Sequence, residues 1–122
     1  MADQPLKNYR IAIVEDEYLL ADELVTALGD AGAIVLGPVG TTEEALDLIE
    51  SHDQIDAAVL DANLHGEMAF VVADALQSRN VSFMFLTGYD HSMFPPRFAD
   101  VVRCEKPANM ARVVRQLCGL LT

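Results

Sequence analysis

The stretch Ile11-Ala12-Ile13-Val14-Glu15-Asp16-Glu17 is an apolar run of four residues that ends in three consecutive acids. A run that is apolar at every position is typical of a strand buried on both faces, in a parallel sheet covered by helices. Two further runs, apolar apart from Ser82, also end at a polar residue, Ala57–Leu60 before Asp61 and Val81–Leu86 before Thr87. These runs predict an α/β sheet whose strand ends carry polar side chains.

Segments with helical spacing separate these runs. Apolar residues recur three or four positions apart over residues 20–31, 45–49, 69–76 and 110–121, and Gly32 is expected to end the first helix. Thr41 and Glu44 form a capping box for the second helix. We expect a second strand at Ala33–Leu36, before Gly37-Pro38, and a loop over Ala62–Gly66.

The stretch from Tyr89 to Ala99 is expected to be irregular. Pro95-Pro96 allows at most a short helix there, because proline in a helix interior removes a hydrogen bond. A fifth strand is expected at Asp100–Cys104. The predicted fold is a flavodoxin-like (βα)5 sandwich of class α/β, with a five-stranded parallel sheet in the order 2-1-3-4-5 and a shortened fourth helix. We expect a single domain over residues 1–122, with its core at about 9–121 and no output domain.

Length and composition restrict the function. With 122 residues, 52% of them hydrophobic, the chain can bury a core, and it has no apolar run near the roughly 20 residues of a membrane span. It also lacks the pattern of a signal peptide, so we expect a cytoplasmic protein. Its two cysteines, Cys104 and Cys118, are interpreted as reduced thiols, with Cys104 in the core. A net charge of −11 argues against nucleic-acid binding.

Polar residues at the strand ends are expected to converge. The carboxyl ends of parallel strands form the ligand-binding edge of such a sheet. Three carboxylates in one small pocket repel each other unless a cation offsets them, and Mg²⁺ suits oxygen ligands. A carboxylate beside a metal, a lysine and a hydroxyl can act as a nucleophile toward phosphorus. The candidate residues are Glu15, Asp16, Asp61, Thr87 and Lys106.

Each of these residues also has a purely structural interpretation. The acids at 15–17 can stabilise a helix N-terminus, by about 0.3–1 kcal/mol each. Asp61 can cap a turn, Thr87 can be an ordinary strand-end residue, and Lys106 can be solvated. Only their combination, in this order along the chain, favours a phosphorus-directed site.

In these motifs the chain resembles the receiver domain of two-component response regulators, from about Tyr9 to Leu121. The matching motifs are Val14-Glu15-Asp16, Val59-Leu60-Asp61, Leu86-Thr87-Gly88 and Lys106-Pro107. The resemblance implies that Asp61 accepts a phosphoryl group from a phosphohistidine of a partner histidine kinase or phosphotransfer protein. It further implies Mg²⁺ (or Mn²⁺) held by Glu15, Asp16, Asp61 and the carbonyl of Asn63, phosphoryl contacts from Thr87 and Lys106, and a cis bond before Pro107.

The chain departs from the family pattern at Arg103. Many receivers have Tyr or Phe three residues before the lysine, where its rotamer reports activation. The stretch Phe85-Leu86-Thr87-Gly88-Tyr89 instead resembles a subgroup with a Phe-Ala-Thr-Gly loop, familiar from alphaproteobacterial stand-alone regulators and stress-response pathways. Tyr89 either takes over part of the aromatic role or packs over the loop.

Other aromatic and histidine residues are less specific. Met93-Phe94 with Phe98 either packs in the core or forms a docking patch. The histidines at 52, 65 and 91 are interpreted as surface residues.

We expect output by protein contact, as a phosphorelay shuttle, a phosphate sink or a regulator of a kinase or other partner. A downstream target would dock on the face of the fourth helix, fifth strand and last helix, and homodimerisation stays open. The alternatives are a receiver-like scaffold that is never phosphorylated, an Asp-nucleophile phosphohydrolase and a flavin-binding module. The hydrolase would want a second acid where Asn63 stands, and the flavin module a Gly/Ser/Thr loop where Glu15-Asp16-Glu17 stands.

Overall fold

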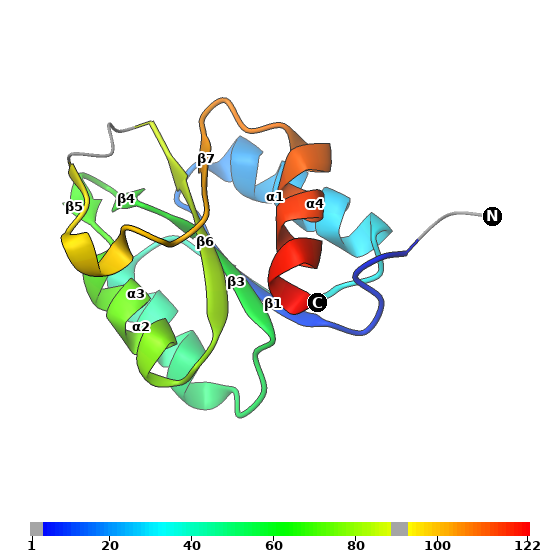
Figure 1. Cartoon of the computed structure of the whole chain (residues 1–122), viewed down its shortest axis with the longest axis horizontal. Helices are drawn as coiled ribbons and strands as arrows, with labels where there is room; N and C mark the ends of the chain where they lie inside the picture. Colours follow the sequence, from blue (N-terminus) through cyan, green and yellow to red (C-terminus); the bar gives the residue numbers. More distant parts are fainter. Residues whose placement is uncertain (1–3, 89–92) are drawn as a thin grey trace.

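The computed structural model describes residues 4–88 and 93–122, which form a five-stranded parallel sheet between helices. The sheet order is β2-β1-β3-β6-β7, which confirms the predicted order. Figure 1 shows α2 and α3 on one side of the sheet and α1 and α4 on the other. The elements are β1 (Arg10–Val14), α1 (Tyr18–Asp30), β2 (Ile34–Val39), α2 (Thr42–Ser51), β3 (Ala57–Asp61), β4 (Asn63–Leu64), β5 (Glu67–Met68), α3 (Phe70–Ser78), β6 (Ser82–Thr87), η2 (Pro96–Phe98), β7 (Arg103–Glu105) and α4 (Met110–Leu121).

Two apolar cores lie on the two faces of the sheet. Side chains alternate between the faces along each strand, so Ala12 and Val14 join the core under α2 and α3, whereas Ile11 and Ile13 join the core under α1 and α4. Every residue of β3 is buried, as expected for a central strand covered on both sides. This burial explains the unbroken apolar runs of the sequence.

The second strand is longer than predicted. It runs to Val39, through Gly37-Pro38, whose peptide bond is cis. Proline is tolerated because β2 is an edge strand, and the pairing with β1 shifts register between Ala12 and Val14. Gly37 has φ +92°, and a Cβ there would lie 3.0 Å from the Ile13 carbonyl oxygen.

Residues 62–66 do not form the simple loop that was predicted. Asn63–Leu64 and Glu67–Met68 pair as the short antiparallel hairpin β4–β5. His65 and Gly66 join them, with φ of +52° and +84°, the sign that the favoured two-residue hairpin turns require. The prediction failed because histidine is not one of the usual residues at such a turn.

The fifth strand also begins later than predicted. β7 covers Arg103–Glu105, and the Val101 N–H instead donates to the Phe98 carbonyl, in the turn that follows η2. The single turn η2 agrees with the predicted shortened fourth helix, and α2 begins at the predicted cap, where Thr41 Oγ1 accepts from the Glu44 N–H at 3.1 Å. Cys104 is buried, and both cysteines are free thiols. None of the described helices has the length and apolar character that crossing a membrane would require.

Candidate functional site

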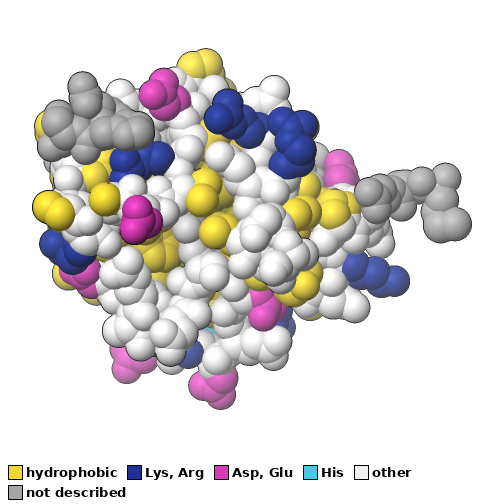
Figure 2. All heavy atoms as spheres, viewed as in Figure 1, with side chains coloured by type: hydrophobic (Ala, Val, Ile, Leu, Met, Phe, Trp, Pro, Cys, Tyr) yellow, Lys and Arg dark blue, Asp and Glu magenta, His cyan; other side chains and the backbone are white. Residues whose placement is uncertain are grey.

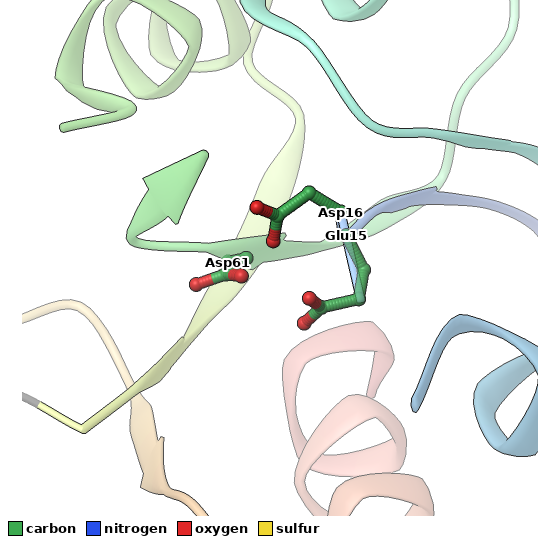
Figure 3. A group of neighbouring side chains, drawn as sticks. All are labelled: Glu15, Asp16 and Asp61. Carbon is green, nitrogen blue, oxygen red and sulfur yellow. The ribbon is translucent and has the colours of Figure 1, made fainter. Parts of the chain in front are cut away.

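Three carboxylates meet at the carboxyl edge of the sheet. Glu15 and Asp16 directly follow β1, and Asp61 is the last residue of β3, the strand beside it. One oxygen from each carboxylate lies within 4.8 Å of the other two. Figure 3 shows the three side chains close to one another, Glu15 and Asp16 just after β1 and Asp61 at the end of β3. The parallel pairing of β1 with β3 therefore places these acids as the sequence predicted.

Lys106 reaches the same point from the end of β7. Its Nζ lies 3.0 Å from Asp61 Oδ2, 3.3 Å from Glu15 Oε1 and 3.9 Å from Glu17 Oε1. Its main-chain N–H donates to the Thr87 carbonyl at 2.9 Å, which ties the lysine to the end of β6. The bond between Lys106 and Pro107 is cis, as the resemblance implied. One ammonium group is thus shared by three acids.

The polar edge surrounds a hollow of about 280 Å³. Glu15 and Thr87 do not line it, since they are only 3% and 1% exposed. Asn63, the predicted carbonyl ligand, is at the rim, where its main-chain N–H donates to Asp61 Oδ1 at 3.0 Å. The residues that line the hollow are Asp16, Glu17, Asp61, Asn63, Gly88 and Lys106.

The acids of the site differ in how readily they ionise. Burial, and then the neighbouring Asp61 carboxyl, raises the pKa of Glu15 from 4.5 to about 8. Burial also raises the pKa of Asp61, although its contacts with Glu15, Asn63 and Lys106 act in the opposite direction. Asp16 is less buried; burial raises its pKa, but the hydrogen bond from the His65 N–H and the contacts with Asp61 and Glu15 together outweigh burial and lower it. Glu15 and Asp61 are therefore harder to ionise than ordinary carboxyl groups, and Asp16 is easier to ionise.

Lys106 stays charged in this setting. Burial alone would lower the pKa of its ammonium, but the hydrogen bond to Asp61 and the charges of the nearby acids outweigh burial and raise it. Even so, Glu15 Oε1 is buried and lacks a hydrogen-bond partner among the described residues, because Lys106 lies outside hydrogen-bond geometry for this atom. The acidic side of the site thus has room for a further positive charge.

Two contributors to the site were missed from the sequence. Glu17 lines the hollow and lies near Lys106, although the sequence placed it only in the acidic run. His65 was predicted to be a plain surface residue. Its side chain is 65% exposed, but its main-chain N–H donates to Asp16 Oδ2 at 2.9 Å. This contact depends on the unpredicted hairpin, so no sequence signal could have found it.

Arg103 occupies the position where many receivers have an aromatic residue. Its guanidinium carbon lies 4.4 Å from the centre of the Phe94 ring, and its Nη2 donates to the Phe98 carbonyl at 2.8 Å. Phe94 and Phe98 are buried, whereas Met93 is 51% exposed, so two of the three candidate docking residues pack in the core. Tyr89 and His91 lie outside the described residues.

No protein-family model and no curated protein matches the chain. The solution structure of SdrG from Sphingomonas melonis Fr1 is 39% identical, with a TM-score of 0.80, and the match covers 94% of this chain and 98% of that one.

A second SdrG structure, the BeF3-activated conformation from Pseudomonas melonis Fr1, is 36% identical over 100% of both chains, with a TM-score of 0.77. A response regulator receiver protein from Sinorhizobium medicae WSM419 is 24% identical, with a TM-score of 0.78, and covers 96% of this chain and 99% of that one; it shows the shared fold. On the strength of the SdrG match, the chain belongs to the receiver-domain family of response regulators.

Proposed function

We propose that the chain is a phospho-acceptor whose Asp61 takes a phosphoryl group from a phosphohistidine of a histidine kinase or phosphotransfer protein. The observation that carries this proposal is the contact of Lys106 Nζ with Asp61 Oδ2, at 3.0 Å, beside a cluster of three carboxylates. A lysine that is simply solvated would not contact two buried carboxylates, as Lys106 does with Glu15 and Asp61. Membership of the receiver family supports the same function.

The donor set fits a divalent cation. Glu15, Asp16 and Asp61 offer three oxygens within 4.8 Å of one another, and one buried Glu15 oxygen has no hydrogen-bond partner in the part of the chain that the structure describes. Hard oxygen ligands suit Mg²⁺ or Mn²⁺, and we assign these three carboxylates and the Asn63 carbonyl to it. When bound, the cation supplies positive charge beside the transferring phosphoryl oxygens.

The chain's own residues carry out the rest of the transfer. An Asp61 carboxylate oxygen attacks the phosphorus, so that a P–O bond forms while the P–N bond to the donor histidine breaks and its electron pair returns to the imidazole nitrogen. Lys106 holds Asp61 and offsets charge on the phosphoryl oxygens, and Thr87 contributes a hydroxyl at the end of the neighbouring strand. Positioning and charge stabilisation are the main requirements of such a step.

Phosphorylation then acts on the segment next to Thr87. The modification adds about −1.5 to −2 charges at neutral pH, between Thr87 and Lys106. That charge alters the surface formed by η2, β7 and α4, through which the protein contacts its partners. SdrG has been solved in a BeF3-activated conformation, which supports a comparable response here.

The test is incubation with a small phosphodonor and Mg²⁺, followed by measurement of the intact mass. We expect the parent chain to gain one phosphoryl group, and Asp61→Asn to gain none. Asp74→Asn, which changes an acid on α3 outside the site, is the matched control and should be modified like the parent. Steady release of phosphate from many esters would indicate a phosphohydrolase, and an unchanged parent would indicate a scaffold; either result contradicts the proposal.

A further inference from the structure

Charge is distributed very unevenly over the chain. Residues 96–122 contain five of the eight basic residues but only two of the 19 acidic ones. This segment supplies η2, β7 and α4, which lie on the near face in Figure 1. Figure 2 shows dark-blue Lys and Arg groups gathered on the upper part of that face. One face of a strongly acidic protein is therefore locally basic.

The arginines of this face differ in how they are held. Arg97 forms a two-point ion pair with Asp74, at 2.8 and 3.0 Å, so its charge is compensated. The side chains of Arg103, Arg112 and Arg115 form no ion pair with any carboxylate in residues 4–88 and 93–122. Arg112 and Arg115 are exposed on α4. Within the described part of the chain, no carboxylate compensates these three positive charges.

Two of these arginines border one hollow. Arg103 and Arg112 line a polar hollow of about 380 Å³ between β7 and the start of α4, together with Glu105 and Asn109. The Phe94 ring and the Phe98 carbonyl already hold the Arg103 guanidinium, so little side-chain freedom remains to be lost on binding. Glu105 adds a hydrogen-bond acceptor to the same hollow. A partner segment that carries a carboxylate next to a hydrogen-bond donor would match this lining, with the carboxylate toward the arginines and the donor toward Glu105.

We propose that the face of Arg103, Arg112 and Arg115 binds an acidic segment of a partner protein, with one partner carboxylate placed between Arg103 and Arg112. The inference rests on the proposed function and deepens it by naming the chemistry of the partner. A net charge of −11 disfavours nucleic acids and anionic membranes, and it also makes a second copy of this chain a repulsive partner. A local complementary patch overcomes that repulsion only at short range.

The face is directly connected to the phosphorylation site. β7 carries Arg103 and leads straight into Lys106, whose Nζ contacts Asp61. A charge added at Asp61 pulls on Lys106 and hence on the strand that holds Arg103. Binding of an acidic segment is therefore expected to respond to phosphorylation.

The test uses the full ¹⁵N-labelled chain and a helical peptide made of Glu and Ala, with a Lys and Ala peptide of the same length as the opposite-charge probe. We expect the acidic peptide to shift amide signals, mainly within residues 97–115, and the basic peptide to shift none. Arg112→Glu should raise the apparent Kd roughly tenfold, and Lys7→Glu, an equal charge change at an exposed lysine outside this face, by less than about twofold. Arg112→Gln should give an intermediate rise, and the amide spectrum reports whether each variant is folded.

Three results would overturn the inference: no shifts on this face, equal weakening by both charge reversals, or equally tight binding of a DNA oligonucleotide of the same charge. Phosphoryl acceptance by the parent chain is measured separately by intact mass. A parent that is phosphorylated but does not bind the peptide contradicts only the basic-face inference. A parent that binds the peptide but is never phosphorylated contradicts only the proposed function.

Discussion

At the scale of single residues, the site is defined by acids that the fold keeps from ionising together. Glu15 is buried, and its pKa is raised to about 8, so near neutral pH the folded protein holds a proton there that the unfolded chain would release. Lys106 favours the ionised forms of both Glu15 and Asp61, but burial outweighs its effect on the pKa of each carboxyl. Because Glu15 takes up this proton on folding, the stability of the protein should depend on pH.

Without divalent cations, the free energy of unfolding should fall as the pH rises from about 4.5 to about 8. Between these values the folded chain binds more protons at Glu15 than the unfolded chain does, so the stabilisation is fully present below 4.5 and is lost as the pH passes through 8. Thermal unfolding at pH 5 and pH 8 in a chelator checks this. Glu15→Gln should largely remove the dependence, and Mg²⁺ should restore stability to the parent at pH 8. A parent equally stable at both pH values would contradict this interpretation.

Lys106→Met should slow phosphorylation by a small donor roughly ten- to hundredfold, because it removes the ammonium beside Asp61 and keeps most of the aliphatic stem. The rate of mass gain at saturating Mg²⁺ is the measurement. Lys7→Met makes the same chemical change at an exposed lysine, so its rate should equal that of the parent. Equal rates for Lys106→Met and the parent would show that Lys106 does not assist the transfer.

At the scale of elements, the sequence predicted the elements with strong periodicity and missed the boundaries that depend on backbone geometry. The central strands were readable because they are apolar on both faces, and α2 because its capping box forms. Two features could not be predicted from the sequence: the extension of β2 through Gly37-Pro38 and the β4–β5 hairpin. The first depends on an edge position in the sheet, and the second on positive φ at His65.

One contact between elements was also invisible in the sequence. Arg79, directly after α3, donates from Nη1 to the Ile49 carbonyl and from Nη2 to the His52 carbonyl, at the end of α2. A positive charge at a helix C-terminus also interacts favourably with the helix dipole. This arginine therefore joins the two helices on one side of the sheet.

Arg79→Ala should lower the free energy of unfolding by about 1–3 kcal/mol, because several carbonyls at the end of α2 lose a charged donor. Urea unfolding is the measurement. Arg115→Ala removes an exposed arginine that makes no ion pair with the described residues, and it should change stability by less than about 0.5 kcal/mol. Similar losses for both variants would mean that Arg79 does not hold α2.

At the scale of the whole molecule, the sheet brings together residues that are far apart in the sequence. Four of the predicted site residues, Glu15, Asp16, Asp61 and Lys106, gather at one sheet edge, because parallel strands end on the same side, and Asn63 lines the same hollow. The sequence could not predict that Glu17 joins them or that Thr87 is buried outside the hollow, since both depend on side-chain packing. The basic face likewise could not be predicted from the sequence alone, because it depends on the fold, which brings residues 97–115 to one side.

We propose that phosphoryl transfer ends on Asp61 and depends on a divalent cation. Phosphorylated protein can be reduced with borohydride, which converts an acyl phosphate to an alcohol, and then digested for peptide mass analysis. We predict a single homoserine, at position 61, which appears with Mg²⁺ and disappears in a chelator. Label at any other acid, or the same yield at position 61 in chelator, would contradict cation-dependent transfer to Asp61.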